Sequence, residues 1–570
     1  MPEEGSQMEQ QQEQQEQQEL TVLIYFASDN PLAPLVVSEL KAIKDAGFQE
    51  HTTVLCLYDP MEKSAPTQLL DVNFKRRKEE HTFIGDGADP YVRNMTEDEV
   101  PESEFTKGMH ATVEDTVTAF ESLRSFIEFT LQKRPARNYM LILLGHGMIV
   151  GSDTFLPDGN SDSAITLKQL RVLCEMFPSD DNKPSLRLLG LHSCSMSSIE
   201  VAYELKGKAD YMLATQGTMF VNGWPYRQLL KKTFNQVKQI KKKGRNLTSE
   251  EYGDLIGKLY KLCLYNFTDF MTAGYSCDIA LCRLNEPDNF EKLKKALQNL
   301  VAALKPELLP TSVSRIKDAV LLAHWDAQSF WSESYTDLWD FCDCLATRCR
   351  KANLVSEIPE LCKAVQNALA FETEKGDSKG IVRNADNFGI EYQYARGLSI
   401  YFPWHKPFEV QETTPDKEKC DEQTQPQPTR KTILQNYRCY AFTSEFGEHH
   451  WLGFLQAYWD GTKREERNKE KSPFFKRIKD NLDLPPTTSA EDVYKKAEDV
   501  FDKRIKRTPE LKKTPDVGID CTCPTIKNYP TKPRKPHSDP KSDRNVPQFS
   551  ITPGALGAFL PPKEGEHEEQ

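Results

Sequence analysis

Apolar positions in the first 230 residues follow two patterns: short continuous runs, and three- or four-residue spacing. The continuous runs are bounded by turn residues, as is typical of parallel strands buried on both faces. The five strand candidates are Leu20–Ser28, Thr53–Tyr58, Tyr139–Leu144, Leu186–Leu191 and Tyr211–Thr215. Helical spacing follows several of them, as over residues 35–45 and 199–205. Strands that alternate with helices predict βαβ units, and therefore an α/β fold with a mostly parallel sheet.

The segments between these strands differ in how clearly they predict structure. Residues 112–132 and 167–176 have helical spacing, and Thr166 is a suitable N-cap for the second helix. Residues 59–109 are charged and rich in turn residues. The loop Met148–Ala164 contains Gly, Asp, Ser and Pro and predicts no clear element.

Beyond residue 228 the pattern changes to longer helices with isolated strands. Lys231–Arg245 is rich in lysine and predicts an exposed helix or loop, and residues 441–459 resemble a docking helix rich in aromatics. Further helices are predicted over 250–270, 290–304, 314–324 and 335–351, and strands over 278–283, 379–382 and 398–402. The chain thus divides into a Gln-rich arm (1–19), an α/β core (20–228), a helical and mixed region (229–460) and a charged, Pro-rich tail (461–570). We expect the arm and most of the tail to be disordered.

Composition excludes several classes of function. The 570-residue chain is 38% hydrophobic and carries a formal charge of −12. It has no basic stripe that would suggest a nucleic-acid partner, and no apolar run of about 18 residues that would span a membrane. Its 14 cysteines are scattered at irregular spacing, which favours a reduced, cytoplasmic protein over a disulfide framework. We expect no metal site and no cofactor from the residues alone.

Two of the apolar runs end in reactive side chains. Tyr139–Leu144 leads into Gly145-His146-Gly147, and Leu186–Leu191 leads into His192-Ser193-Cys194. The carboxyl ends of parallel strands meet at one edge of a sheet, where catalytic groups of α/β proteins gather. A histidine and a cysteine side by side are the minimum for a thiolate nucleophile with a general base, so His146 and Cys194 are the candidate catalytic pair.

The same residues offer donors for an oxyanion. Gly147 has no side chain, so a substrate can approach its N–H closely. We expect the N–H of Cys194 to be the second donor, at the start of a helix. The alternatives are plainer: a cysteine after an apolar strand is often a core residue, and His146 alone could be a loop histidine. The segment GHGMIVG does not have the glycine spacing of a nucleotide-binding loop.

The chain also resembles the clostripain-like cysteine peptidases of the caspase-like clan. The resemblance covers roughly residues 20 to 460. The segments that carry it are Tyr25–Leu32, Tyr139–Gly147, Cys194–Leu205, Tyr211–Gln216, Gly223-Trp224-Pro225-Tyr226, Gly397–Pro403 and the helix at Trp451. The stretch from Cys194 to the GWPY signature is the specific part, and the order of histidine first and cysteine about 50 residues later fits the clan.

The resemblance implies a caspase-like three-layer sandwich and an endopeptidase that works through an acyl-enzyme. Cys194 would be the nucleophile, His146 the base, and His192 and Gln216 would belong to the substrate pocket. One position departs from the family, because His192 stands where these peptidases usually carry the Asp that binds a basic P1 side chain. We therefore expect no strong preference for P1 Arg or Lys, unless another acid such as Asp210 restores it.

Further expectations come from the family. Calcium dependence is known there, and Asp153, Asp158, Asp162 and Asp181 could be ligands only by geometry. Family members are often zymogens cut internally, and the loop after His146 and the lysine-rich segment are candidate processing sites. We expect a protein substrate and an activating partner that binds the tails. Two other functions stay open: a catalytically silent binding module, and an enzyme acting on non-peptide acyl groups.

Overall fold

The computed structural model describes residues 18–462, with longer gaps at 73–92, 95–116, 371–378 and 408–432 and several shorter ones, together with positions 485, 492 and 496. The predictions for the N-terminal arm, for most of the charged stretch 59–109 and for most of the tail therefore concern residues outside the described ones. Among the described helices, none is long and apolar enough to cross a membrane.

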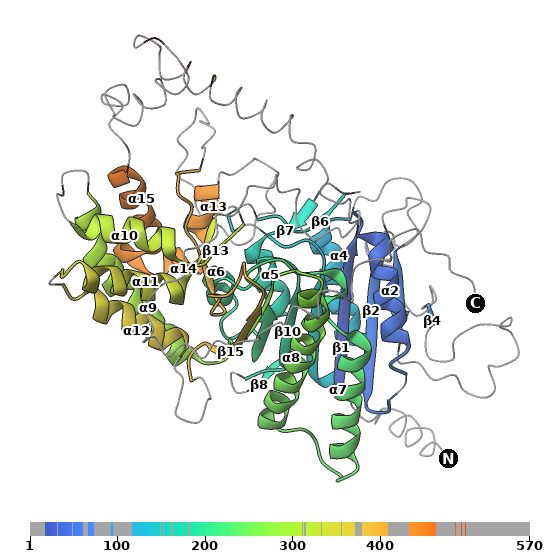
Figure 1. Cartoon of the computed structure of the whole chain (residues 1–570). Helices are drawn as coiled ribbons and strands as arrows, with labels where there is room; N and C mark the ends of the chain where they lie inside the picture. Colours follow the sequence, from blue (N-terminus) through green and yellow to red (C-terminus); the bar gives the residue numbers. More distant parts are fainter. Residues whose placement is uncertain are drawn as a thin grey trace, which may run out of the picture. The chain divides into compact units, whose positions relative to one another are not determined.

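A nine-stranded sheet dominates the described residues, with the strand order β15-β12-β11-β10-β5-β1-β2-β3-β4 (Figure 1). The strands are β1 Gln18–Ser28, β2 Thr52–Pro60, β3 Gln68–Asp71, β4 Arg93–Asn94, β5 Ala136–Leu144, β10 Leu186–His192, β11 Tyr211–Ala214, β12 Cys277–Arg283 and β15 Val382–Phe388. The five central strands, β11 to β2, run parallel, and the outer strands pair antiparallel. This confirms the α/β fold with a parallel central sheet, and the one sheet takes strands from both sides of residue 228.

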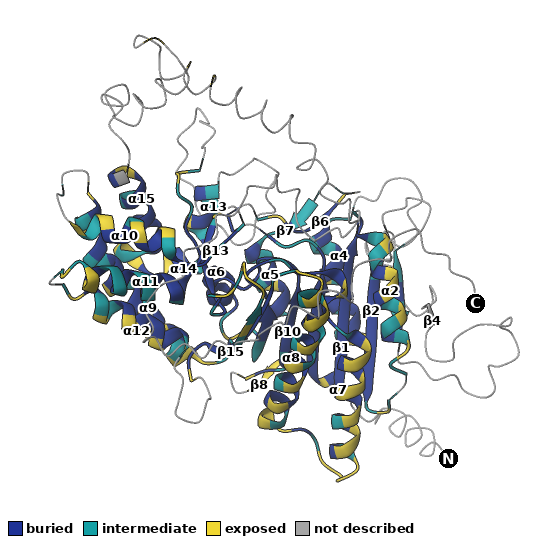
Figure 2. Ribbon diagram, viewed as in Figure 1, coloured by how far each residue is buried: buried dark blue, intermediate teal, exposed yellow. Residues whose placement is uncertain are grey.

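Helices cover both faces of the sheet, because successive apolar residues of its strands point to opposite faces. Val22 and Ile24 of β1 face the first core, and Leu23 and Tyr25 face the second. The helices over the first face are α2 Ala33–Lys44, α7 Tyr226–Lys241 and α8 Ser249–Thr272; those over the second are α4 Ala119–Lys133, α5 Leu167–Glu175 and α6 Ile199–Glu204. Figure 2 shows the strands buried and the outer helical faces exposed.

The second core continues into the C-terminal region. Its helices are α9 Pro287–Leu308, α10 Arg315–Asp326, α11 Leu338–Lys351, α12 Ile358–Leu369, α13 Ile433–Cys439, α14 Ala441–Ser444 and α15 Trp451–Thr462. A small sheet of β13 Ser329–Phe330, β14 Tyr335–Asp337 and β16 Ser399–Tyr401 lies among them. A parallel bridge between Ser198 and Ser399 joins this small sheet to the start of α6. The C-terminal region is therefore connected directly to the segment that follows Cys194.

Several local predictions were confirmed, and others were wrong. Thr166 caps α5 through a capping box, as its position indicated. The stretch after His146 is not free of elements, because β6 Phe155–Asp158 and β7 Ser163–Ile165 form a hairpin. Both strands are too short to show a sequence period, and burial of their apolar residues brings them together.

The boundaries of three C-terminal elements also differ from the prediction. Helix α11 begins at Leu338, because Asp337 caps it and residues 335–337 form β14. The predicted docking helix over 441–459 is interrupted at Gly447, whose φ of +60° is outside the right-handed helical region. The strand predicted over 379–382 lies a few residues later, as β15.

Candidate active site

The ends of β5 and β10 lie side by side at the carboxyl edge of the sheet. His192, the last residue of β10, pairs in register with Leu144, the last residue of β5. The turns that follow carry His146 and Cys194. Their backbones are in close contact, since a Cβ atom added to Gly147 would lie 1.8 Å from the carbonyl oxygen of Cys194 and 3.0 Å from its nitrogen. Only glycine fits at this position, so the sequence His146-Gly147 permits the approach.

Cys194 lies in a tight turn that is held on both sides. Ser195 has a φ of +55°, and its N–H donates to the carbonyl of Gly217 at 3.0 Å. Its hydroxyl donates to the carbonyl of Met148 at 2.8 Å. Cys194 does not open a helix, contrary to the prediction, because α6 begins only at Ile199 and its N-cap is Ser198. The tight turn, rather than a helix terminus, therefore positions the Cys194 thiol.

The thiol of Cys194 is buried and hydrogen-bonded in this structure. Its exposed fraction is 1%. The N–H of Met219 donates to Sγ at 3.1 Å. The thiol in turn donates to the Met219 carbonyl, which is 3.6 Å from Sγ. Met219 belongs to the segment of residues 215–221 that follows β11, here called the Met219 segment. In this conformation the thiol is therefore not accessible to a substrate carbonyl.

Side chains from distant parts of the chain hold the Met219 segment. The carboxylate of Asp278 accepts the N–H groups of Gln216 at 2.6 Å and Gly217 at 2.8 Å. The indole N–H of Trp331 donates to the Gln216 carbonyl at 3.1 Å. The Tyr392 hydroxyl accepts an N–H of the same segment at 3.2 Å. Burial raises the pKa of Asp278 to about 7, although the two N–H donors act in the opposite direction.

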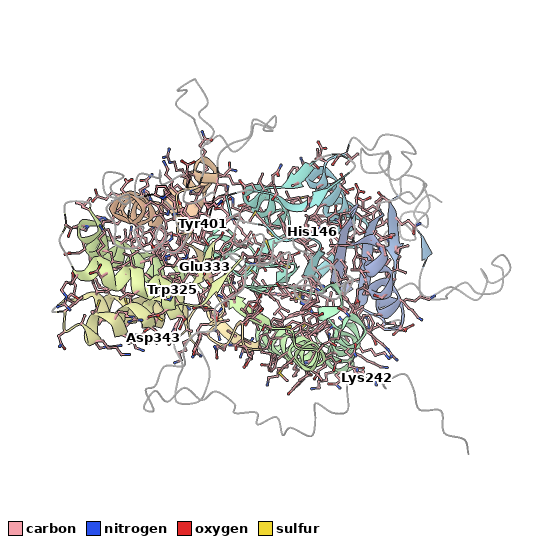
Figure 3. The ribbon with its side chains drawn as sticks, turned by 45° about the horizontal axis from the view of Figure 1, so that its top comes forward. His146, Lys242, Trp325, Glu333, Asp343 and Tyr401 are labelled. Atoms are coloured by element: carbon pink, nitrogen blue, oxygen red, sulfur yellow. The ribbon has the colours of Figure 1, made fainter. Side chains whose placement is uncertain are left out.

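His146 is half-buried, and its carbonyl accepts the N–H of Leu156 in the neighbouring hairpin at 3.1 Å. Its Nδ1 is buried and has no hydrogen-bond partner within the described part of the chain. Figure 3 shows His146 beside the strands of the central sheet, apart from Trp325 and Asp343 in the C-terminal helices. The imidazole is thus not tied to a carboxylate or carbonyl among these residues.

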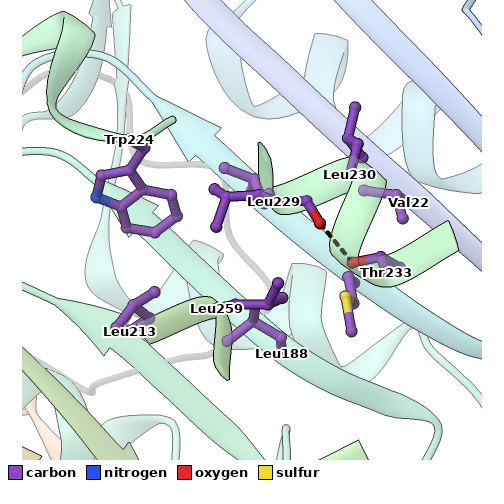
Figure 4. A pocket seen from close by; sticks show the side chains of 10 residues that line it. Val22, Leu188, Leu213, Trp224, Leu229, Leu230, Thr233 and Leu259 are labelled. Carbon is purple, nitrogen blue, oxygen red and sulfur yellow. Dashed lines mark hydrogen bonds between the residues drawn. The ribbon is translucent and has the colours of Figure 1, made fainter. Parts of the chain in front are cut away.

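His192 is enclosed by aromatic residues. Its ring stacks on Trp224 with centroids 4.8 Å apart. Nδ1 is 2.9 Å from the hydroxyl of Tyr226, and Nε2 is 2.8 Å from the carbonyl of Phe220. Burial lowers the pKa of His192 to about 3, so the ring is neutral at physiological pH. Trp224 also lines a small apolar cavity of about 20 Å³ between the sheet and helices α7 and α8 (Figure 4).

Gln216 is buried as deeply as His192. Its side-chain amide donates to Asp337 at 2.9 Å, and its side-chain oxygen accepts the N–H of Gly397 at 2.8 Å. Both Gln216 and His192 have an exposed fraction of 0%. Neither presents a surface to a substrate in this conformation, so their place in a substrate pocket stays a prediction. Burial raises the pKa of Asp337 to about 7.

The other acidic candidates are engaged by neighbouring residues. Asp210 precedes β11 and forms an ion pair with Arg187 at 2.7 Å, at the opposite edge of the sheet from Cys194. It therefore does not replace the acid missing at His192. Asp153 accepts the hydroxyl of Tyr440 at 2.5 Å, and Asp158 accepts an N–H of its own hairpin at 3.0 Å. The other two calcium candidates, Asp162 and Asp181, lie outside the described residues, and the described ones contain no metal-binding group of three ligands.

Sequence reasoning missed Met219 and Asp278. Met219 acts through its backbone, which leaves no trace in the sequence. Asp278 did leave one, because it is a single carboxylate in the strand Cys277–Arg283, which is apolar from Ile279 to Cys282. An acid in such a strand needs donors nearby, and those donors are the N–H groups of the Met219 segment.

Comparison with known proteins decides the family. The model of the clostripain family (peptidase family C11) matches residues 24–423 of the chain. The chain belongs to this family. It is a clostripain-family cysteine peptidase, as the resemblance in the sequence predicted. A search of curated proteins gave no match.

Solved structures of C11 proteases are similar at low identity. An inactive zymogen C11 protease from Parabacteroides distasonis is 18% identical, with a TM-score of 0.43 over 68% of this chain and 92% of that one. A secreted C11 cysteine protease from Bacteroides thetaiotaomicron, solved with an irreversible peptide inhibitor, is 14% identical, with a TM-score of 0.43 over 76% of this chain and 99% of that one.

Proposed function

We propose that this clostripain-family peptidase cleaves proteins internally, with Cys194 as nucleophile and His146 as general base. The observation that carries the proposal is the close contact between the two turns, where Gly147 lies against the backbone of Cys194. Adjacent parallel strands hold both turns, so the two reactive residues keep their spacing. The free Nδ1 of His146 is consistent with a dyad that has no third member.

The proposed reaction has two steps. His146 takes the proton of Cys194, and Sγ attacks the scissile carbonyl to form a tetrahedral intermediate. The N–H groups of Gly147 and Cys194 stabilise its oxyanion. The C–N bond then breaks as His146 gives the proton to the leaving amine. In the second step His146 removes a proton from water, which attacks the thioester and releases Cys194.

The environment of His192 supports a P1 preference other than Arg or Lys. A basic P1 side chain needs a carboxylate where this chain has a buried imidazole, and the pKa of about 3 keeps that ring neutral. A cation left unpaired in such a site costs several kcal/mol, about 3 or more. Asp210, the other acid considered as a partner for a basic P1 side chain, is paired with Arg187 instead. We therefore propose a neutral or acidic P1 residue.

The contact between Cys194 and the Met219 segment supports a latent form of the enzyme. The thiol is covered, so activation must displace the segment. Of the two candidate processing sites, the lysine-rich one is the more accessible: α7 ends at Lys241, and residues 242–245 are exposed. The loop after His146 is instead folded into the β6–β7 hairpin. A proteolytic cut between α7 and α8 is the favoured route, and binding of an activating partner is the alternative.

One experiment tests activity and P1 preference together. Wild type and Cys194→Ala are incubated with reduced cell extract, with and without calcium, and new protein N-termini are mapped. We expect termini that depend on Cys194, with few Arg or Lys residues at P1. Dominant P1 Arg or Lys would overturn the specificity, and identical maps for both proteins before and after limited proteolysis would favour the binding module. A thioester-linked non-peptide product at Cys194 would indicate acyl transfer instead.

A further inference from the structure

The C-terminal segment of residues 433–445, here called the C-terminal anchor, touches the loop that carries His146. That loop runs from His146 to Asp153. The N–H of Gly151 donates to the hydroxyl of Tyr440 at 2.9 Å, and the same hydroxyl donates to Asp153 at 2.5 Å. The amide of Asn436 donates to the carbonyl of Gly151 at 2.8 Å. One tyrosine hydroxyl therefore bridges a buried donor and a carboxylate of the His146 loop.

The opposite side of the C-terminal anchor binds the helix that follows Cys194. Glu200 on α6 accepts the hydroxyl of Tyr437 at 2.7 Å. Glu204, one turn later, accepts the N–H of Ala441 at 2.7 Å. Both carboxyl groups are buried, with exposed fractions of 0% and 2%. The C-terminal anchor is thus fixed to the Cys194 side of the site by two buried acids.

Backbone geometry shows that the His146 loop depends on these contacts. Gly151 and Asp153 have φ values of +87° and +51°, in the left-handed region. A Cβ atom on Gly151 would lie 2.5 Å from a methyl carbon of Ile433 in the anchor. The hydroxyl of Tyr335 also accepts the N–H of Val150. Within the described residues, side chains far along the chain thus supply donors and acceptors that the loop needs.

We propose that Tyr440 is a positioning residue for the dyad. By fixing Gly151 and Asp153, Tyr440 holds His146 at the correct distance from Cys194. This inference rests on the proposed dyad. Removing the hydroxyl takes away the acceptor of the Gly151 N–H and one donor to Asp153, which also accepts the N–H of Leu167 at 3.4 Å. The loop then relaxes to satisfy the Gly151 N–H. A displacement of about 1 Å at a reacting group can cost roughly 100-fold in rate.

The test compares Tyr440→Phe with Tyr458→Phe in the full chain. Tyr458 is a matched control, since its buried hydroxyl bonds to His324 at 2.9 Å in the C-terminal helices, away from the dyad. Activity is measured on a fluorogenic peptide taken from a mapped cleavage site. For Tyr440→Phe we expect kcat to fall by about 10- to 100-fold, with KM within about twofold. Tyr458→Phe should keep kcat within about twofold. Equal losses in both variants, or no loss in Tyr440→Phe, would overturn the inference.

A second readout does not need turnover. The rate of alkylation of Cys194 by iodoacetamide is followed against pH by mass spectrometry, with His146→Ala as reference. In wild type and Tyr458→Phe the profile should contain an inflection that His146→Ala removes, and Tyr440→Phe should remove it as well. A Tyr440→Phe profile identical to wild type would refute the positioning role. Absence of Cys194-dependent cleavage both before and after limited proteolysis, together with the expected profiles, would refute the proteolytic function and leave the positioning role supported.

Discussion

The His146 loop and the Met219 segment both border Cys194, and they are held in different ways. The loop is held by the hydroxyl of Tyr335 and by hydroxyl and amide groups of the C-terminal anchor. Two buried acids of α6 bind this anchor in turn. The side chains of Asp278, Trp331 and Tyr392 hold the segment. Asp337 also holds it through the Gln216 amide, and the N–H of Ser195 through the Gly217 carbonyl. Met219 itself contacts the thiol directly. The loop is thus held mainly by a distant part of the chain, whereas the segment is attached mostly through Gln216 and Gly217 and covers the thiol with Met219. The proposed latent form needs one side of its site fixed and the other side releasable.

The largest effect should come from breaking the fixed side at Glu200. Glu200→Ala leaves the hydroxyl of Tyr437 and the N–H of Tyr401 buried without an acceptor, since both donate to this carboxyl group. We expect a loss of about 3 kcal/mol in the free energy of unfolding. Urea unfolding of wild type and variant measures it.

Glu200→Gln is the matched control for that change. Burial raises the pKa of Glu200, so the protonated acid is favoured and the neutral amide imitates it. The Gln side-chain oxygen can still accept both donors. We expect a loss of about 1 kcal/mol or less. Equal destabilisation by Ala and Gln would show that the negative charge, rather than the acceptor, holds the anchor.

An intermediate effect should come from the releasable side at Asp278. Asp278→Asn keeps one acceptor for the N–H groups of Gln216 and Gly217 and loses the other. Opening of the Met219 segment should become easier by about 1.4 kcal/mol, which corresponds to a roughly tenfold faster alkylation of Cys194. Timed labelling with iodoacetamide, read by mass spectrometry, measures the rate. An unchanged rate would mean that other contacts hold the segment closed.

Asp278 also predicts a pH dependence. The pKa of Asp278 is about 7 in the folded protein, against 3.8 for an ordinary aspartate. Between these two pH values the folded state therefore binds a proton that the unfolded state has lost. Its contribution to stability is therefore complete below pH about 4 and is lost as the pH rises through 7. Subtracting the free energy of unfolding of Asp278→Asn from that of wild type at each pH isolates the contribution of Asp278. A difference that does not vary between pH 4 and 7 would contradict the assignment.

The smallest effect should come from the exposed ion pair of the anchor. Lys206 and Glu445 are 2.5 Å apart, with side chains 29% and 41% exposed. Water and salt screen such a pair, so Lys206→Ala should cost about 0.5 kcal/mol or less in the free energy of unfolding. Urea unfolding at low and high salt measures it. A larger cost would mean that the anchor depends on its surface as much as on the buried acids.

The sequence predicted the parts of the site that depend on local pattern. Continuous apolar runs located β5 and β10, and their parallel arrangement followed from the helices between them, so the meeting of His146 and Cys194 at one edge could be foreseen. It could not predict the partners of Glu200 and Glu204, because both acids bind residues 237 positions away. Nor could it predict the cover on Cys194, since any residue offers the same backbone N–H that Met219 uses.

The two hydrogen bonds of His192 have a spectroscopic consequence. The Phe220 carbonyl can only accept, so Nε2 must carry the proton and the neutral ring must accept the Tyr226 hydroxyl at Nδ1. A single tautomer is therefore fixed against Phe220 of the Met219 segment. Its Nε2 proton should exchange slowly with solvent while the cover is closed, and rapidly once Phe220 moves. With nitrogen-15-labelled histidine, the exchange rate of this Nε2 proton would report by NMR on movement of the Met219 segment.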